Sequence, residues 1–322
     1  MKKFLVAFCF LFLISACDDG DIEIASFDFL NSTVKVCQAG TNNFFLYTYK
    51  DKRALILKIP ETAFENKLDP SIKLLTINAT NEAIYREYVG NVADDNICAF
   101  PTNVSLGLEK QWSGVGGTIK IETSISKTED LLTGVSRYAT YNHRITLINP
   151  SFSNGAGGEQ KMDLIEFGTY SKPNENNLNN FVVIPNEIKK CTANTFFYKT
   201  NARQALELTV DSTIFSTSIL DTPKVRFING TTNKFLFKVF NANVPDTYFC
   251  TTTVPVTPNV VELWTGQNGT NTTGIIEVIT SSIPATSPQQ FKHQIRLKKV
   301  SVEKSGLSFN FGNDYDLGFF IQ

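Results

Sequence analysis

The rarest residues of this chain recur at a nearly constant interval. The only two tryptophans, Trp112 and Trp264, lie 152 residues apart, and the only two histidines, His143 and His293, lie 150 apart. Four cysteines recur at intervals of 152 and 154 residues, and each tryptophan follows one of them by 14 residues. Coincidence is a poor explanation for this agreement among three residue types. The sequence therefore predicts a duplicated domain, each copy of about 150 residues.

Within each repeat, apolar residues alternate with polar ones. Ile119 and Ile121 share one face of a predicted strand, while Lys120 and Glu122 share the other. Such alternation is typical of strands with one buried face, and the high content of Phe, Thr, Asn, Ile and Val favours β structure. Groups of Gly, Asn and Pro separate these segments, and no long stretch has helical spacing.

We predict an all-β fold of two tandem, homologous β-sandwich domains, immunoglobulin-like in the broad sense. In true immunoglobulin domains the core tryptophan follows the first cysteine, whereas here it follows the second. The predicted ranges are 24–170 for the first domain and 181–322 for the second. Residues 171–180 are rich in polar residues and are predicted to form a linker.

The cysteines predict one disulfide in each repeat. Apart from Cys9 in the N-terminal apolar segment and Cys17 directly after it, four remain: Cys37, Cys98, Cys191 and Cys250. An even number in an exported chain suggests two disulfides, and four cysteines allow three pairings. Because each repeat should close its own loop, the duplication selects Cys37–Cys98 and Cys191–Cys250. Each loop has about 60 residues, for which closure is worth roughly 4 kcal/mol on the chain-entropy model.

The N-terminus predicts an exported, lipid-anchored protein. Two lysines precede an apolar run over residues 4–14, and small residues precede Cys17. This pattern is typical of a secretory signal, since a membrane span takes about 18 or more apolar residues. The segment that ends at Cys17 resembles the bacterial lipobox, which implies that residues 1–16 are removed and that Cys17 carries a covalent lipid of two or three acyl chains. The alternative is an ordinary signal peptide with a cysteine near its cleavage site.

Residues 17–23 form an acidic leader that contains Asp18, Asp19 and Asp21. It resembles the export signal that sends Bacteroidota lipoproteins to the outer face of the outer membrane. The resemblance implies an outer-membrane location facing the cell exterior. In enterobacterial lipoproteins an Asp in this place favours retention in the inner membrane instead. Two alternatives are the periplasmic face of the outer membrane and a solvated leader whose acidity is accidental.

Together these features resemble surface-exposed Bacteroidota lipoproteins of the flavobacterial type, with two tandem β domains. Beyond the lipobox and the leader, loose motifs spread over most of the mature chain carry the resemblance: Tyr85-Arg86, Cys98-Ala99-Phe100-Pro101, Phe249-Cys250, Val254-Pro255, Pro258 and Glu262-Leu263-Trp264. The resemblance implies a cellular location and no activity.

Residues that could perform catalysis are scarce. His143 shares a predicted strand face with Ile145, and His293 with Ile295, so both are predicted to be core residues rather than acid–base groups or metal ligands. Neither a Gly-x-Ser-x-Gly elbow nor a His-Glu-x-x-His motif occurs. The oxygen-rich groups Asp94-Asp95-Asn96 and Asn313-Asp314-Tyr315-Asp316 lack the spacing of a twelve-residue Ca²⁺ loop and are predicted to form turns. We expect no catalytic residue, no metal and no cofactor besides the lipid.

Two further features allow more than one interpretation. Trp112 and Trp264 would suit a platform for a sugar ring if they were exposed, while their recurrence at one place favours a structural role. Asp211-Ser212-Thr213 resembles the short O-glycan acceptor of Bacteroidota envelope proteins, a motif that also arises by chance.

The expected function is that of a surface-anchored, non-enzymatic binding or scaffold protein, an accessory subunit of an outer-membrane complex. Its expected partners are the membrane, reached through the lipid, and an outer-membrane protein. A net charge of −1 without clustered Lys and Arg argues against nucleic acid. The alternative is a glycan-binding lipoprotein of a nutrient-capture system, and an unrecognised hydrolase is a third hypothesis. Exposed tryptophans would favour the glycan, and an exposed apolar sheet face would favour a protein partner.

Overall fold

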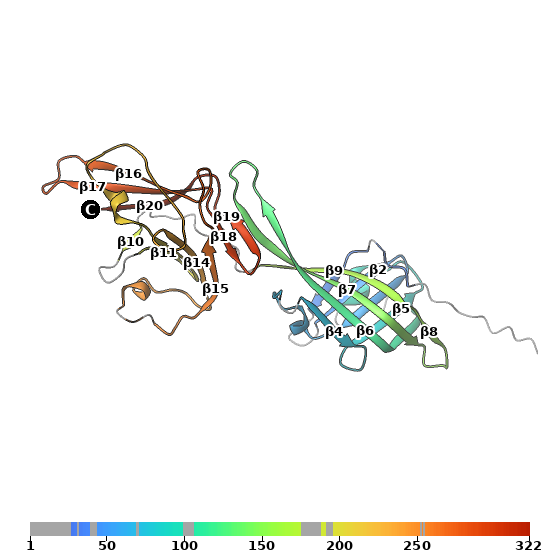
Figure 1. Cartoon of the computed structure of the whole chain (residues 1–322). Helices are drawn as coiled ribbons and strands as arrows, with labels where there is room; N and C mark the ends of the chain where they lie inside the picture. The colour runs from blue at the N-terminus through green and yellow to red at the C-terminus, as the bar shows by residue number, and fades with distance from the viewer. Residues whose placement is uncertain are drawn as a thin grey trace, which may run out of the picture. The chain divides into compact units, whose positions relative to one another are not determined.

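A computed structural model describes residues 27–30, 32–38, 44–68, 71–98, 106–174, 188–190, 196–251, 253 and 255–322 (Figure 1). Packing divides the chain into two units: unit 1 comprises Met1–Ser124 and Asn142–Ser171, and unit 2 comprises Ile125–Tyr141 and Lys172–Gln322. Residues Ile125–Tyr141 lie inside the predicted range 24–170 and pack with unit 2. Antiparallel strands make up nearly all of the regular structure in both units, which confirms the all-β prediction.

Unit 1 is built on one nine-stranded sheet in the order β1-β2-β3-β5-β6-β7-β8, with β4 paired to β6 and β9 paired to β7. The elements are β1 Lys35–Gln38, β2 Phe44–Lys50, β3 Arg53–Lys58, η1 Glu61–Phe64, β4 Ile72–Thr76, β5 Glu82–Tyr88, α2 Asp94–Cys98, β6 Leu108–Glu129, β7 Ser136–Ser153, β8 Glu159–Lys161 and β9 Leu164–Pro173.

The long strand β6 belongs to both layers of the sandwich. Its residues 108–113 pair with β5, and its residues 118–122 pair with β4. Between these stretches Gly117 has a φ of 109°, and a Cβ there would lie 2.6 Å from the Cα of Pro150 on β7. Only glycine allows this close approach of two backbones together with a positive φ. The bend at this glycine lets a single strand leave one layer and enter the other.

The two layers of unit 1 enclose one hydrophobic core. Its fully buried side chains come from β2, β3 and β5 on one side and from β6, β7 and β9 on the other: Leu46, Leu55, Leu57, Tyr85, Ile119, Ile121, Ile145, Leu147 and Phe167. Each buried Leu or Ile contributes roughly 1.5–3 kcal/mol. The predicted alternation on β6 is confirmed, since Lys120 and Glu122 form an ion pair of 2.9 Å on the opposite face from Ile119 and Ile121.

Unit 2 has two sheets, one of seven strands in the order β10-β11-β12-β14-β15-β18-β19 and one of four in the order β13-β16-β17-β20. The elements are β10 Lys189–Lys190, β11 Phe197–Asn201, β12 Gln204–Thr209, η3 Ser212–Phe215, β13 Lys224–Phe227, β14 Lys234–Phe240, η4 Tyr248–Cys250, β15 Val260–Gly266, β16 Ile275–Ile283, β17 Gln290–Lys298, β18 Ser301–Lys304, β19 Leu307–Asn310 and β20 Tyr315–Ile321.

The strand pairing of unit 1 recurs in unit 2, as the duplication predicts. Trp264 pairs with Phe237 across β15 and β14, just as Trp112 pairs with Tyr85 across β6 and β5. In unit 1 the first buried Ile after Trp112 is Ile119, 7 residues later. In unit 2 the first buried Ile after Trp264 is Ile276, 12 residues later. The five additional residues lie in the loop of residues 267–274 between β15 and β16, so one bent strand of unit 1 corresponds to two strands of unit 2.

The tip of the hairpin between β6 and β7 forms part of unit 2. The backbone N–H of Asn310 donates to the Ser136 hydroxyl at 2.9 Å, and the N–H of Ser308 donates to the Tyr138 hydroxyl at 3.0 Å. Both N–H groups lie on β19, the last strand in the order of the seven-stranded sheet. Backbone N–H groups at the edge of a sheet can pair with a strand of another chain if nothing covers them. The hairpin tip therefore covers an edge of unit 2.

The same hairpin tip closes one end of the core of unit 2. Tyr138 stacks on Trp264 with ring centroids 6.1 Å apart, and Val135 forms an antiparallel bridge with Phe311. The N–H of Asn313 donates to the carbonyl of Thr133 at 2.7 Å. The core of unit 2 thus includes a side chain from a segment more than 120 residues away from Trp264 in sequence.

Candidate interaction surfaces

The predicted anchor and leader, Cys17 with Asp18, Asp19 and Asp21, lie outside the described residues. Lipidation and surface export therefore stay predictions. Within the part of the chain that the structure describes, no helix has both the length and the apolar character needed to cross a membrane.

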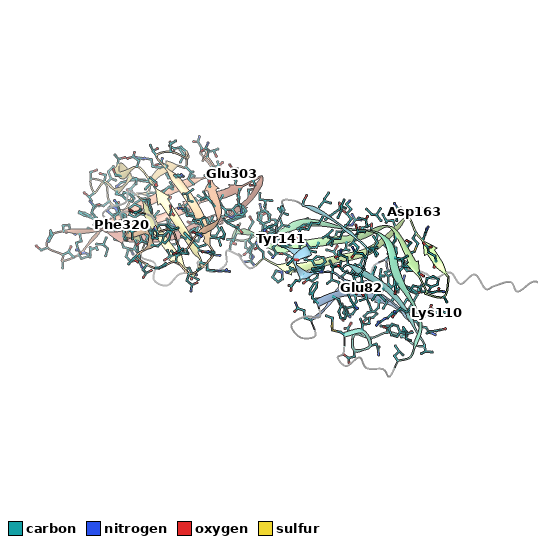
Figure 2. All side chains as sticks on the ribbon, turned by 90° about the horizontal axis from the view of Figure 1, so that it is seen from below. Glu82, Lys110, Tyr141, Asp163, Glu303 and Phe320 are labelled. Atoms are coloured by element: carbon teal, nitrogen blue, oxygen red, sulfur yellow. A yellow bond between two sulfur atoms is a disulfide. The ribbon has the colours of Figure 1, made fainter. Side chains whose placement is uncertain are left out.

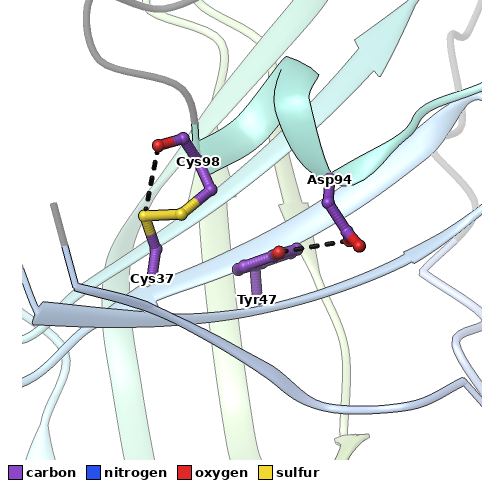
Figure 3. Close-up of a disulfide and its surroundings, with 4 residues drawn as sticks. All are labelled: Cys37, Tyr47, Asp94 and Cys98. Carbon is purple, nitrogen blue, oxygen red and sulfur yellow. Dashed lines mark hydrogen bonds between the residues drawn. A yellow bond between two sulfur atoms is a disulfide. The ribbon is translucent and has the colours of Figure 1, made fainter.

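The disulfide predicted for the first repeat is confirmed. Cys37 on β1 is bonded to Cys98 at the end of α2, with Cα atoms 5.5 Å apart (Figure 3). The bond holds α2 against the outer face of the large sheet, over a small apolar cluster that includes Ile56 and Ile97. In the second repeat Cys250 is disulfide-bonded. Its predicted partner, Cys191, lies outside the described residues, so this pairing stays a prediction.

Asp94, one of the oxygen-rich candidates, binds side chains of unit 1. Lys35 Nζ donates to its carboxylate at 2.8 Å. The Tyr47 hydroxyl also donates to it, at 3.1 Å, as Figure 3 shows. The Lys35 contact lowers the pKa of Asp94, and the same contact raises the pKa of Lys35. Burial, together with the nearby Asp94 charge, raises the pKa of Tyr47 to about 12. These bonds attach α2 to β1 and β2.

The second oxygen-rich candidate is arranged in a similar way. Asp314 forms an ion pair with Arg296 at 2.8 Å, and Asp316 accepts a hydrogen bond from Gln294 at 2.6 Å. Among the residues that the structure describes, no three His, Cys, Asp or Glu side chains gather as a metal site would require.

His143 is fully buried, as expected of a core residue. Its Nδ1 lies 3.0 Å from the hydroxyl of Thr123 on the neighbouring strand β6. Phe64 contacts the ring edge-on with centroids 5.5 Å apart, and Tyr170 stacks on it at 6.1 Å.

His293 occupies the equivalent place in unit 2 with the same kinds of neighbour. Thr280 lies 2.9 Å from Nδ1, Phe215 meets the ring edge-on at 5.4 Å, and Phe320 stacks on it at 4.7 Å. Its Nε2 lies 3.1 Å from the side-chain oxygen of Gln322. Burial lowers the pKa of His293, although the Gln322 contact partly opposes this shift. A neutral, fully buried imidazole fits a structural role better than proton transfer to a substrate.

The two tryptophans are also core residues. Trp112 is 4% exposed and Trp264 is 6% exposed. Trp264 lies against Phe309 at 4.9 Å, and its indole N–H donates to Glu262 at 2.8 Å. Neither indole offers an open face on which a sugar could stack, so their burial does not support the proposed glycan platform.

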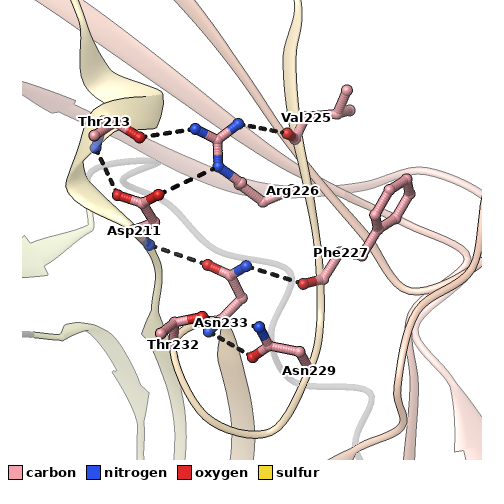
Figure 4. A network of polar contacts seen from close by, with 8 residues as sticks. All are labelled: Asp211, Thr213, Val225, Arg226, Phe227, Asn229, Thr232 and Asn233. Atoms are coloured by element: carbon pink, nitrogen blue, oxygen red, sulfur yellow. Dashed lines mark hydrogen bonds and ion pairs between the residues drawn. The ribbon is translucent and has the colours of Figure 1, made fainter.

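The Asp211-Ser212-Thr213 motif begins the short helix η3. Asp211 accepts a hydrogen bond from the N–H of Thr213 at 3.0 Å, which is the geometry of an N-cap (Figure 4). Arg226 on β13 donates to the Thr213 hydroxyl at 2.8 Å, and Asn233 accepts from the N–H of Asp211 at 3.0 Å. A structural role in joining η3 to β13 therefore accounts for Asp211 and Thr213.

The outer face of β15 is apolar and exposed. Val261 and Leu263 point away from the core, with 53% and 47% of their surface exposed. Val256, in the loop before this strand, is 84% exposed. Glu303, labelled in Figure 2, lies on the adjacent strand β18 across from Thr265 and gives the face a charged rim. We call Val261 and Leu263 the β15 face.

The duplicate positions in unit 1 carry polar residues. Because Trp112 corresponds to Trp264, Glu109 and Gln111 hold the places of Val261 and Leu263. Gln111 accepts a hydrogen bond from Arg86 at 2.9 Å on its partner strand. The same backbone therefore supports a polar outer face in one unit and an apolar one in the other. Sequence reasoning missed this difference, although aligning the two repeats at their tryptophans would have revealed it.

A buried lysine was also missed. Lys199 on β11 is 5% exposed and donates to the carbonyl of Leu317 at 3.0 Å. Burial lowers its pKa. Thr48 holds the same place in unit 1, since the pairing of β2 with β3 matches that of β11 with β12. The lysine lies inside the sandwich, where a hydrogen bond between the two sheets explains it.

No family model matches this chain, and neither a curated protein nor a solved structure is similar to it.

Proposed function

We propose that this chain is a lipid-anchored, surface-displayed binding protein without enzymatic activity, which serves as an accessory subunit of an outer-membrane protein complex. The β15 face carries this proposal. Two apolar side chains stand on the open side of a central strand, where the other repeat has Glu109 and Gln111. An exposed apolar patch costs solubility unless a partner covers it, and its absence from the duplicate shows that the fold does not need it.

The lipobox-like segment at Cys17 and the acidic leader support the location. A short leader would keep unit 1, which follows it, close to the membrane that the lipid enters, where an outer-membrane protein is a suitable partner. The burial of both histidines supports a binding role over acid–base catalysis, because a general base must come within hydrogen-bond reach of its substrate.

Exchange of residues between the repeats tests the proposal. Val261→Glu with Leu263→Gln gives unit 2 the residues that unit 1 carries, so this double variant should keep its stability to within about 0.5 kcal/mol. Mild-detergent extraction after crosslinking should recover a defined partner with the wild-type chain, and the double variant should lose most of it. The reciprocal change, Glu109→Val with Gln111→Leu, is the matched control and should leave recovery unchanged. A partner recovered equally well by the double variant would contradict a role for this face.

A further inference from the structure

The turn of the hairpin between β6 and β7 exposes two adjacent leucines. Leu131 is 89% exposed and Leu132 is 92% exposed, the largest fractions among the exposed large apolar residues of the described chain. Both lie inside the continuously described range 106–174. Single apolar residues are common on protein surfaces, but two neighbours held almost entirely in water form a concentrated apolar point. We call Leu131 and Leu132 the leucine pair.

Hydrogen bonds hold the turn that carries the leucine pair. The Asp130 carboxylate accepts from the N–H of Leu132 at 2.9 Å, and the Asp130 carbonyl accepts from the N–H of Gly134 at 2.7 Å. Gly134 has a φ of 70°, which glycine adopts without strain. The carbonyl of Thr133 is bound in turn by the N–H of Asn313 in unit 2. The backbone is therefore fixed, and the leucine pair cannot fold back onto the core without breaking these bonds.

The duplicate hairpin carries no such pair. It joins β16 to β17, which hold Thr280 and His293 where β6 and β7 hold Thr123 and His143. Its turn, residues 284–289, reads Pro-Ala-Thr-Ser-Pro-Gln and contains no large apolar residue. The fold therefore closes this hairpin without leucines, and their exposure in one copy points to a contact outside the chain.

We propose that the leucine pair inserts into the surface of the lipid bilayer to which the predicted anchor attaches the chain. Anchoring raises the effective concentration of the turn at the membrane, so a contact that is weak by itself becomes occupied. The insertion would give unit 2 its own contact with the bilayer. This inference goes beyond the proposed function, rests on the proposed membrane location and is independent of the β15 face.

A bilayer fits the leucine pair better than a protein partner does. Stable protein–protein interfaces bury about 1,200–2,000 Å², far more than two leucine side chains supply. Trp, Tyr and Arg dominate the energetics of such interfaces, and leucine is under-represented. Residues 130–134 include none of those three types. Aliphatic side chains at a protruding turn need no shaped pocket among acyl chains, which adapt to them.

The charges of the hairpin limit how the turn can bind. Among residues 127–137, Lys127 and Arg137 balance Glu129 and Asp130. Balanced charges give little attraction to anionic headgroups, so burial of the leucine pair should drive the insertion. Hydrogen bonds from the Thr133 hydroxyl and from backbone N–H groups of the turn lower the pKa of Asp130. This carboxylate therefore stays charged and keeps the insertion shallow, with only the leucines passing the headgroups.

Vesicle binding of an unlipidated chain measures the insertion. The expected mature chain, residues 17–322 with Cys17→Ser, is sedimented with phosphatidylcholine vesicles at millimolar lipid. We expect weak, reversible binding, too weak to survive membrane washing, because even one acyl chain binds only marginally. Leu131→Ser and Leu132→Ser should each weaken binding by about tenfold or more. Added salt and added phosphatidylglycerol should change it little, because the charges balance.

The matched control is Val261→Glu with Leu263→Gln. It removes two exposed apolar side chains from the β15 face of the same unit and should leave vesicle binding unchanged. Loss of vesicle binding in this variant as well would show that exposed apolar residues bind lipid without distinction, and would contradict a site at the turn.

Fluorescence locates the turn in the lipid-anchored chain. Leu132→Trp places an indole on the turn, and acyl chains that carry bromine should quench it in vesicles. Ser287→Trp, in the turn of the duplicate hairpin, is the control and should not be quenched. The parent chain gives the background from Trp112 and Trp264, which are buried.

Two results would overturn the inference. One is vesicle binding that is absent, or that stays unchanged when both leucines are replaced by serine. The other is an indole at position 132 that brominated acyl chains do not quench in the anchored protein. If the leucine variants then lose a crosslinked protein instead, the leucine pair belongs to a protein interface. Because partner recovery by the β15 face is measured separately, either proposal can fail while the other stands.

Discussion

Each buried histidine belongs to a small cluster that both units reproduce. A threonine hydroxyl lies within 3.0 Å of the ring, and two aromatic rings enclose it. Alternation along the strands was enough to predict that His143 and His293 are buried. The sequence did not reveal Thr123 and Thr280 as their partners, because neighbours across a sheet depend on register.

The burial of His293 predicts a pH dependence of stability. Its folded-state pKa lies below the ordinary value of 6.5, so the unfolded chain takes up a proton more readily. The free energy of unfolding should therefore fall as the pH falls below about 6.5, by at most about 1.4 kcal/mol per pH unit for this residue. Urea unfolding between pH 7.5 and 5.5 measures this slope, with Trp112→Phe in the background so that Trp264 reports on unit 2.

His293→Gln removes the titrating group and should give a smaller slope over the same pH range. It should also lower stability at pH 7.5 by about 1–3 kcal/mol, because a buried polar contact is lost. An unchanged slope would show that His293 titrates alike in the folded and unfolded states.

Cys17 is the residue on which the predicted location depends. Cys17→Ser removes the thiol that would carry the lipid, so the protein should leave the membrane fraction and lose incorporation of labelled fatty acid. Cys9→Ser is the control, since Cys9 would be removed with the signal segment and its change should have no effect. Retention of the Cys17 variant in membranes at high salt would disprove the lipid anchor.

At the scale of secondary-structure elements, the alternation of apolar and polar residues predicted the strands correctly. Similar residues in the two repeats were a less reliable guide to how the repeats align. The pairs Phe44-Phe45 and Phe196-Phe197 look equivalent in the sequence. The strand register instead places Leu46 opposite Leu57 and Phe197 opposite Leu208, so Phe197 corresponds to Leu46. An alignment based on these phenylalanine pairs would be off by one residue, and a shift of one residue exchanges the buried and exposed faces.

The long hairpin was not foreseen, for a physical reason. Aligning the Thr–His pairs places residues 127–139 of unit 1 against residues 284–289 of unit 2, so the first hairpin is seven residues longer. Nothing local in its sequence indicates where the tip packs. Its contacts with β19 join segments about 170 residues apart, which a pattern read along the chain does not reveal.

Tyr138 is the residue of this hairpin whose removal should be most informative. Tyr138→Ala removes the ring that stacks on Trp264 and the acceptor for the N–H of Ser308. Trp264 fluorescence should shift to the red and become open to collisional quenching, and unit 2 should lose roughly 2–4 kcal/mol. Tyr138→Phe keeps the ring and should cost only about 1 kcal/mol, with little change in quenching. Equal quenching in Tyr138→Ala and wild type would show that the tip does not cover Trp264.

At the scale of the whole molecule, alternation and composition predicted the all-β class, and the duplication selected the Cys37–Cys98 disulfide; both are confirmed. These features follow from residues that recur in each copy. The differences between the copies could not be predicted in the same way. The β15 face, the leucine pair and the packing of Ile125–Tyr141 with unit 2 all arise where one copy departs from the other.

The packing of the hairpin tip leads to a prediction about dissection of the chain. A fragment of residues 172–322 contains all the described strands of the seven-stranded and four-stranded sheets but lacks Ile125–Tyr141, the remaining part of unit 2. The edge of β19 and one face of Trp264 would then be open to water. Compared with the same unit in the full chain, the fragment should unfold at lower urea concentration and show a more quenchable Trp264.

Addition of a synthetic peptide of residues Ile125–Tyr141, closed at its ends to hold the hairpin, should reverse both changes, because a ligand that binds only the folded state stabilises it by RT ln(1 + [L]/Kd). At a peptide concentration of about 100 times Kd, the gain would be about 2.7 kcal/mol. The same peptide carrying Tyr138→Ala is the matched control and should give a much smaller recovery, since it lacks the ring that covers Trp264. If the fragment is as stable as unit 2 in the full chain, the hairpin tip is an accessory contact, and the core of unit 2 is complete without it.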